Sequence, residues 1–584
     1  MRHGPRIGSL RLAGASCALL LAAAAPSASG AHIRANSFLG EIQSTEAQSL
    51  GCASVGGALT VLQEEPYEAL DPGSAYSATA FTVVNATQRS LYTYSPDTVT
   101  EAVPDVAEGP PEISASGRLV TVHLKAGIDF SPPVDREVTS QDVAYAIERG
   151  ASPHVDNPYF REYFGSIEGA SKARGGPIRG IQTPTAHEIV FRLVRPLGDL
   201  VAKALVMPLT APVPKSYAEG FDRHDPSTYE SHEVATGPYM IQNNAAGKVL
   251  GVGYRPGHSL VLVRNPNWDA ASDPRPACLG EIKVVISEEA PTEFALDPLK
   301  GSDTVDAARS SFAEYDLTHF TSQVVTSPGA GESYVALDVR TWPFRDELVR
   351  KALYAALDRA ELNAISGPGS FFQRTATHFL DPGIPGFAQA GAYAGPKGAR
   401  FAFGEHERGD LALARKYLRR AGYRHGRYGG RRRITVGGSL LLREEVSETL
   451  RALGFKVRAA QAGYCAEPRR EVSACLTGWD PDFGDAQAVL GLPFDGERIT
   501  ATENFNQGQV DVPWLDRQMR RAEEIGVEPQ RAGAWARIDD ELVEHAFAIP
   551  LDWETAARLE ASDVHGVADR WNSGNWDYSY TSLK

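Results

Sequence analysis

The sequence lacks the common local signatures of catalysis, nucleotide binding and metal binding. It has no GxSxG, HExxH, P-loop or GxGxxG motif, and no CxxC or HxxxH spacing. The letters DFG occur at 482–484, but the glycine-rich loop, strand lysine and HRD loop of a kinase do not accompany them. We therefore predict no cofactor, no metal and no enzymatic activity. An exported hydrolase stays as an alternative, because a catalytic carboxylate pair needs no local motif.

Basic residues are scarce relative to acidic ones, and long hydrophobic runs are scarce too. The formal net charge is −15, which disfavours nucleic acid as a partner. One uncharged run, residues 12–25, follows three arginines and precedes the small-residue stretch PSASGA. This pattern predicts a secretory signal peptide at 1–31, followed by a mobile leader at 32–55. No later segment reaches 18 uncharged apolar residues, so we expect an exported, extracytoplasmic and soluble protein.

Only five cysteines are present, and Cys17 would leave with the signal peptide. An even number remains for an oxidising compartment, and four cysteines allow three pairings. The short separation of Cys465 and Cys475 favours a disulfide between them, which leaves Cys52 to pair with Cys278. No cysteine directly follows the uncharged run, so the sequence does not support a lipid anchor.

The first half of the chain is dominated by strand patterns. Alternating or apolar segments bounded by turn residues predict strands at 56–63, 118–130, 187–196 and 279–287, and strand–turn units at 236–244 and 259–269. A Thr/Ser start and a terminal glycine predict one short helix at 139–150.

From about residue 290 the pattern changes to alternating helices and strands. Apolar residues at helical spacing predict helices at 344–359, 409–423 and 531–546, with a strand at 547–554. Residues 433–460 read as strand, helix and strand, a βαβ unit that predicts a parallel or mixed sheet with a right-handed crossover. A further short strand is predicted at 473–478.

The segment GWDPDFGDAQ, residues 478–487, starts where that strand ends. In open α/β sheets, ligands bind just beyond the carboxyl ends of strands. Asp480 is interpreted as a turn residue and Asp485 as the cap of the following helix. Asp482 has no local capping role, so it is the candidate to face a ligand and to pair with an ammonium group.

The order and spacing of several blocks resemble bacterial extracellular solute-binding proteins of the peptide/nickel/dipeptide class, the receptors of ABC importers. The resemblance runs from about residue 56 to the C-terminus. It rests on GGALTVLQ…LDPGSAYS, GRLVTVHLKAGIDFSPPVDREVTSQDVAYAIER, TGPYMI, LVRNPNWD, PFRDELVRKALYAALDR, DPGIPGF, DLALARKYLRRAGY, GWDPDFGDAQ and AIPLDWE.

The resemblance implies a two-lobed α/β fold of the large, cluster C periplasmic-binding-protein type, with a hinge between the lobes and an extra subdomain in lobe I. The implied boundaries are lobe I at 56–94, 231–289 and 547–584, the inserted subdomain at 95–230, and lobe II at 290–546. Ligand would be enclosed when the lobes close.

The resemblance also implies a binding site. Asp482 matches the aspartate that takes the peptide α-ammonium, Gly478 and Trp479 belong to the same motif, and Trp479 would form a cleft wall. Tyr76, Ser77 and Ala78 match the first-lobe segment that faces the ligand. The chain departs from the usual ADY-x-DP pattern at Phe483 and Ala486 but keeps its first aspartate as Asp482.

The expected function is that of a monomeric receptor for oligopeptides or similar amine-bearing solutes, which it would deliver to an ABC importer permease. A receptor of the same fold for a non-peptide ligand, such as a metal chelate or glycoside, is the main alternative, because the fold does not fix the ligand.

Overall fold

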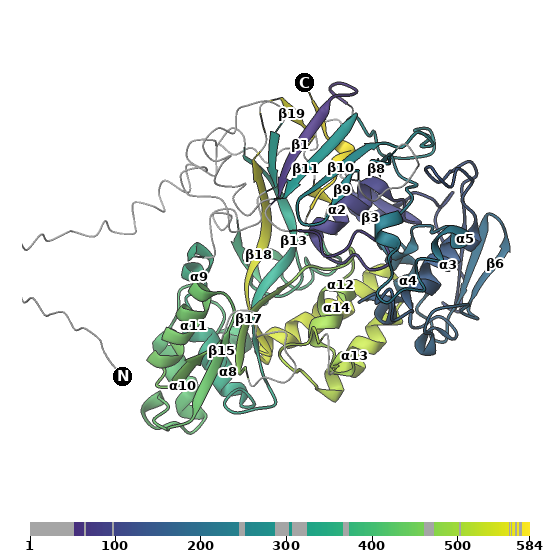
Figure 1. Ribbon diagram of the computed structural model, residues 1–584. Coiled ribbons are helices and arrows are strands. Elements are labelled where there is room, and N and C mark those ends of the chain that lie inside the picture. The colour runs from purple at the N-terminus through teal and green to yellow at the C-terminus, as the bar shows by residue number, and fades with distance from the viewer. Residues whose placement is uncertain are drawn as a thin grey trace, which may run out of the picture. The chain divides into compact units, whose positions relative to one another are not determined.

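The computed structural model describes residues 52–63, 66–95, 98–244, 252–286, 303–306, 324–365, 373–460, 472–500, 504–559, 561, 563–566, 569–570 and 575–583 (Figure 1). The predicted signal peptide and most of the predicted leader lie outside these residues. No described helix is both long and apolar enough to cross a membrane.

A mixed sheet contains 12 of the described strands. Its order is β16-β15-β17-β13-β18-β12-β1-β11-β10-β8, with β14 paired to β18 and β9 to β10. The strands are β1 (Ala58–Gln63), β8 (Tyr239–Ile241), β9 (Tyr254–Arg255), β10 (Ser259–Arg264), β11 (Glu281–Ile286), β12 (Asp303–Asp306), β13 (Val324–Leu337), β14 (Arg374–Thr375), β15 (Arg433–Gly437), β16 (Lys456–Ala459), β17 (Ala474–Trp479) and β18 (Ala548–Leu559).

β13 and β18 connect two parts of the molecule. They pair antiparallel from Val324 opposite Leu559 to Ala336 opposite Ala548. Residues 338–547, called the middle part below, lie between β13 and β18 in the sequence and contribute β14, β15, β16 and β17 to the same sheet (Figure 1). Residues 52–286 are called the first part. Two long paired strands between the parts provide the hinge of a two-lobed fold.

The first part is built around β1, which pairs parallel with β11 and β12. Its core also includes residues near the C-terminus, such as Trp576 and Tyr578. A disulfide joins Cys52 to Cys278 and confirms that predicted pairing. Cys475 is disulfide-bonded as well, and its expected partner Cys465 lies outside the described residues.

Smaller sheets and helices complete the first part and the C-terminal segment. An antiparallel sheet has the order β4-β5-β7-β6, and three further strand pairs are β2 with β3, β19 with β22 and β20 with β21. These strands are β2 (Tyr92–Ser95), β3 (Thr98–Pro104), β4 (Glu112–Ile113), β5 (Leu119–His123), β6 (Ile181–Thr185), β7 (Glu188–Arg192), β19 (Val564–His565), β20 (Asp569–Arg570), β21 (Asn575–Trp576) and β22 (Ser582–Leu583). The helices are α2 (Ala78–Thr87), α3 (Ser140–Gly150), η1 (Phe160–Phe164), α4 (Gly198–Ala204) and α5 (Lys215–Ala218).

The middle part contains the predicted βαβ unit. β15 pairs parallel with β16, and the helix between them is α11, which confirms the unit. β17 pairs parallel with β15 on one edge and antiparallel with β13 on the other, so the sheet is mixed. The described helices are α8 (Glu347–Ala356), α9 (Arg359–Ile365), α10 (Leu411–Arg420), α11 (Leu440–Ala452), α12 (Ala486–Phe494), α13 (Pro513–Glu523) and α14 (Glu528–Glu544).

Local sequence explains where several of these helices begin and end. Asp410 caps α10 by accepting a hydrogen bond of 2.8 Å from the Leu413 N–H, and Gly422 follows the helix with a left-handed φ of +88°. α14 begins earlier than predicted because Pro529 lies in its first turn, where a missing N–H costs little.

Two predictions for the first part need correction. The strand predicted at 118–130 is shorter, because β5 ends at His123 and Gly127 then adopts a φ of +74°. Helix α2 was not predicted at all. Its sequence ATAFTVVNAT has no polar face, since most of its residues are buried, and the amphipathic signal is therefore missing.

Candidate ligand-binding site

β17 has a neighbouring strand on both edges at its start and on one edge at its end. β13 pairs with β17 up to Trp479, which lies opposite Glu332. On the other edge, β15 pairs with β17 only at Ala474 and Cys475. Among the described residues, no strand continues this pairing towards Trp479, so an extended chain could add to this edge through main-chain hydrogen bonds.

Asp482 follows this edge and is buried between the two parts of the molecule. It is 4% exposed. Its Oδ2 atom accepts a hydrogen bond from the Tyr76 hydroxyl at 3.2 Å and a second one from the Tyr163 hydroxyl. Both tyrosines belong to the first part. No described Lys, Arg or His forms an ion pair with Asp482, so its carboxyl is buried with hydroxyl donors alone.

The electrostatic consequence is a proton-binding carboxyl. Burial raises the pKa of Asp482 to about 7, and the charge of Asp480 acts in the same direction. The hydrogen bonds from Tyr163 and Tyr76 lower this pKa only in part. A buried carboxylate without a cation is costly, so this site favours either a proton or a positively charged group.

Aromatic rings surround the Asp482 carboxyl. Tyr163 packs edge-to-face on Phe483, with ring centroids 4.8 Å apart. Tyr76 contacts Phe505 at 6.3 Å, and Phe505 contacts Trp479 at 5.0 Å. Ring faces attract cations, and this attraction is stronger in a site from which water is excluded.

The other predicted site residues are mainly held by the local backbone. Ser77 caps α2, since its hydroxyl accepts from the Ala80 N–H at 3.2 Å, and Ala78 is the first residue of that helix. The backbone N–H of Tyr76 donates to Glu68 Oε1 at 2.9 Å. These bonds fix the backbone that carries the Tyr76 ring.

Trp479 and Gly478 have different surroundings. The Trp479 indole N–H donates to the Ala488 carbonyl at 2.7 Å, which fixes the ring against α12. Gly478 is exposed on β17. The structure thus brings Tyr76, Trp479 and Asp482 together, while Ser77 and Ala78 form the start of a helix.

Asp485 has an environment opposite to that of Asp482. Its Oδ1 accepts from the Gln487 N–H at 2.8 Å, which confirms the predicted helix cap. Arg531 binds it through two nitrogens, at 2.6 and 3.1 Å, and the Lys203 ammonium lies 2.7 Å from Oδ2. Burial acts to raise the pKa of Asp485, but these cations hold that pKa well below its usual range.

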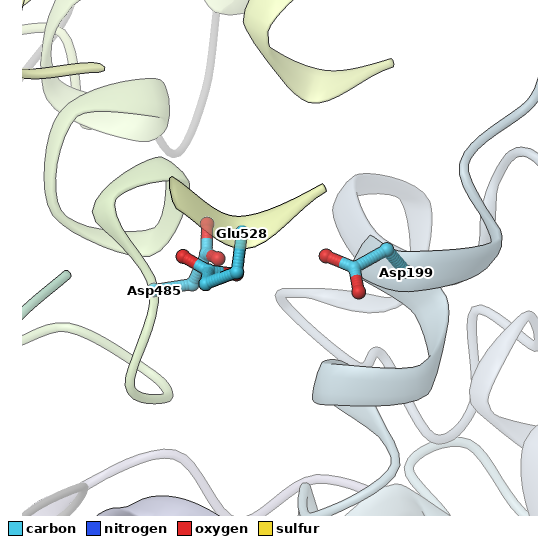
Figure 2. Close-up of side chains that lie close together, drawn as sticks. All are labelled: Asp199, Asp485 and Glu528. Carbon is cyan, nitrogen blue, oxygen red and sulfur yellow. The ribbon is translucent and has the colours of Figure 1, made fainter. Parts of the chain in front are cut away.

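Asp485 also belongs to a group of three carboxylates that could suggest a metal site. Asp199 on α4 faces Asp485, which precedes α12, and Glu528, which begins α14 (Figure 2). The Lys203 ammonium lies 2.5 Å from Glu528, 2.7 Å from Asp485 and 3.6 Å from Asp199. The ammonium of Lys203 thus already lies among the three carboxylates, with Arg531 bound to Asp485, and we assign no metal to the group.

Two residues of this region were missed by sequence reasoning. Tyr163 lies 319 positions from Asp482, and Lys203 lies 282 positions from Asp485. Neither residue forms part of a local motif. Only knowledge of which distant segments meet could have identified them.

Comparisons with known proteins agree with this architecture. The profile described as "Bacterial extracellular solute-binding proteins, family 5 Middle" matches residues 101–500. The periplasmic oligopeptide-binding protein OppA of Escherichia coli is 21% identical over 488 residues, which cover 77% of this chain and 79% of OppA.

Two solved structures share the fold. The clavulanic acid biosynthesis oligopeptide binding protein 2 superposes with a TM-score of 0.78 at 24% identity, covering 91% of this chain and 96% of its own. The Escherichia coli murein tripeptide binding protein MppA superposes with a TM-score of 0.70 at 19% identity, covering 92% of this chain and 99% of the MppA chain. Both confirm a two-lobed α/β binding-protein fold. The family profile covers more than half of this chain. The chain therefore belongs to the bacterial extracellular solute-binding proteins of family 5, the peptide class of ABC-importer receptors.

Proposed function

We propose that this protein binds short peptides, or similar solutes with a free ammonium group, between its first and middle parts. The observation that carries this proposal is the state of Asp482, a buried carboxyl with two hydroxyl donors and no cationic partner among the described residues. The ligand would supply the missing positive charge.

An ammonium group fits the chemistry of this position. It offers three N–H donors, and a charge-assisted hydrogen bond to a buried carboxylate is about twice as strong as a neutral one. Both tyrosine hydroxyls donate to Oδ2, while no described residue donates to Oδ1. The ammonium would bind Oδ1, beside the rings of Tyr76 and Trp479.

An extended peptide also fits the edge of β17. Its main chain would pair with the strand near Gly478, and its N-terminus would then lie close to Asp482. In this mode the main-chain bonds provide affinity and the side-chain pockets provide specificity.

The bound ligand would favour closure, because the carboxylate comes from the middle part and both tyrosines come from the first part. A ligand that contacts both parts binds the closed form better and shifts the equilibrium towards it. We expect the closed protein to act as a monomer outside the cytoplasm and to present its ligand to the permease of an ABC importer.

A thermal-shift series tests the proposal. Peptides of two to five residues with a free N-terminus should raise the melting temperature of the mature protein, and mass spectrometry should identify amine-bearing solutes that copurify with it. Stabilisation by metal chelates or glycosides, with no effect of any peptide, would instead support the non-peptide alternative. Turnover of a bound solute would support the hydrolase alternative.

A further inference from the structure

We propose that Lys203 is a closure latch, whose ammonium joins the first part to Asp485 and Glu528 of the middle part and thereby sets affinity without selecting the ligand. Lys203 lies on α4, whereas Asp485 precedes α12 and Glu528 begins α14. The Lys203 nitrogen is 2.7 Å from Asp485 Oδ2 and 2.5 Å from Glu528 Oε2. The latch assignment rests on the two-part closure described above.

The contact of Lys203 with Asp485 is shielded from solvent, whereas the Glu528 side chain is 42% exposed. The Lys203 side chain is 25% exposed, and that of Asp485 is 1% exposed. Ion pairs in such surroundings are screened less by salt and water than pairs on the open surface. The carboxylates of Asp485 and Asp199 raise the pKa of Lys203 despite its burial, so the ammonium stays charged at neutral pH.

The latch can release because each partner keeps a second ion pair within its own part. Asp485 remains bound to Arg531, which lies on α14 in the same part of the molecule. Lys203 retains Asp199, one turn earlier on α4, at 3.6 Å. Opening therefore leaves neither group as a bare buried charge, and the large cost of such a charge is avoided.

The latch lies beside the proposed ligand site. Asp485 is three residues from Asp482 in the loop between β17 and α12. On the other side, α4 packs against η1, which carries Tyr163. Movement that brings Tyr163 onto Asp482 therefore also brings Lys203 onto Asp485, so one closing motion forms both contacts.

Two neighbouring hydrogen bonds also join the first part to the middle part. The Gly484 N–H donates to the Tyr94 hydroxyl at 3.0 Å, and the Gln487 amide donates to Glu162 at 2.8 Å. Both bonds join the first part to the loop and helix that carry Asp485. Ion pairs of Arg498 with Glu162 and of Arg195 with Glu523 also join the two parts. Lys203 is the residue to test because its buried partner Asp485 lies three residues from Asp482.

The test compares Lys203→Met, Lys203→Arg and the matched control Lys172→Met, whose lysine is exposed. Surface plasmon resonance would measure the affinity and the dissociation rate of a free-amine tripeptide and of its N-acetyl form. We expect Lys203→Met to lower the affinity for both peptides by the same factor, about five- to tenfold, through faster dissociation. Lys203→Arg should largely restore binding, and Lys172→Met should have no effect.

Small-angle X-ray scattering of the ligand-free proteins is the second measurement. Lys203→Met should have a larger radius of gyration than the wild type and the control. If no peptide binds any variant, the proposed function fails, and scattering still decides on the latch. If Lys203→Met leaves both the radius of gyration and the peptide dissociation rates unchanged, the latch assignment is overturned. A change in dissociation rate for only one of the two peptides would overturn it as well.

Discussion

Asp482 and Asp485 are three residues apart, equally buried and chemically identical, yet their environments are opposite. Asp482 accepts hydrogen bonds from two tyrosine hydroxyls, whereas Asp485 accepts them from Arg531, Lys203 and a backbone N–H. The pKa of Asp482 is raised to about 7, and that of Asp485 is held well below its usual range.

The difference separates the carboxylate that we propose to bind ligand from a structural one. Asp485 is already paired by residues of this chain, so its charge stabilises the fold and the closed arrangement. Asp482 lacks such a partner among the described residues, so its charge is stable only when a cation arrives from outside. A buried carboxyl without a cationic partner is thus a better indicator of ligand binding than an acidic residue as such.

Replacing Asp485 should have the largest effect on stability. Asp485→Asn removes the charge that neutralises Arg531, a residue that is 1% exposed, and should lower the free energy of unfolding by about 3–5 kcal/mol. Chemical denaturation measures this loss. Asp482→Asn is the matched control and should cost far less, because it leaves no buried cation behind. Equal losses in the two variants would remove the distinction between the two carboxylates.

The pH dependence of binding should follow Asp482. Its raised pKa means that the closed, ligand-free protein holds a proton up to about pH 7, and an ammonium ligand must displace it. Affinity for a free-amine peptide should therefore rise from pH 5 to 7 by at most about tenfold per pH unit, and then level off. Calorimetry in buffers of different ionisation enthalpy should detect the released proton.

In the ligand-free protein, the contributions of Asp482 and Asp485 to folding stability should change with pH in opposite directions. The raised pKa of Asp482 makes its contribution fall as pH rises from about 4 to about 7. The depressed pKa of Asp485 gives a contribution that is complete above about pH 4 and is lost in stronger acid. Asp482→Asn should abolish the pH dependence of binding, and a dependence that survives in this variant would assign it to another group.

The tyrosine hydroxyls should have the smallest effect. Tyr163→Phe removes one donor to Asp482 Oδ2 and should weaken peptide binding at pH 7 by about 1 kcal/mol. It should also move the midpoint of the pH dependence upward, because fewer hydrogen bonds then favour the carboxylate. Tyr76→Phe should act in the same direction. A variant that binds normally at every pH would show that these hydroxyls do not tune Asp482.

Local features of the sequence predicted a substantial share of this architecture. The periodicity of residues 433–460 predicted the βαβ unit, and the end of the strand at 473–478 predicted the Asp485 cap. These features depend on neighbouring residues, so a single sequence contains them. The match of Tyr76 to the ligand-facing segment came from the family resemblance instead.

What the sequence could not predict depends on contacts between distant segments. Tyr163 and Lys203 reach their aspartates across 319 and 282 residues. Helix α2 was missed for a different reason: burial on most sides removes the polar face by which an amphipathic helix is recognised. The sequence alone therefore pointed to Asp482 as a candidate but not to the groups that determine its charge.

The most direct test is the ratio of dissociation constants for an N-acetylated tripeptide and the same tripeptide with a free amine, measured by calorimetry at pH 7.5. In the wild type we predict a ratio of at least about thirtyfold, because acetylation removes the charge that Asp482 binds. In Asp482→Asn the ratio should fall close to one. Equal affinity of the wild type for both peptides would contradict the assignment of Asp482 as the ammonium-binding residue.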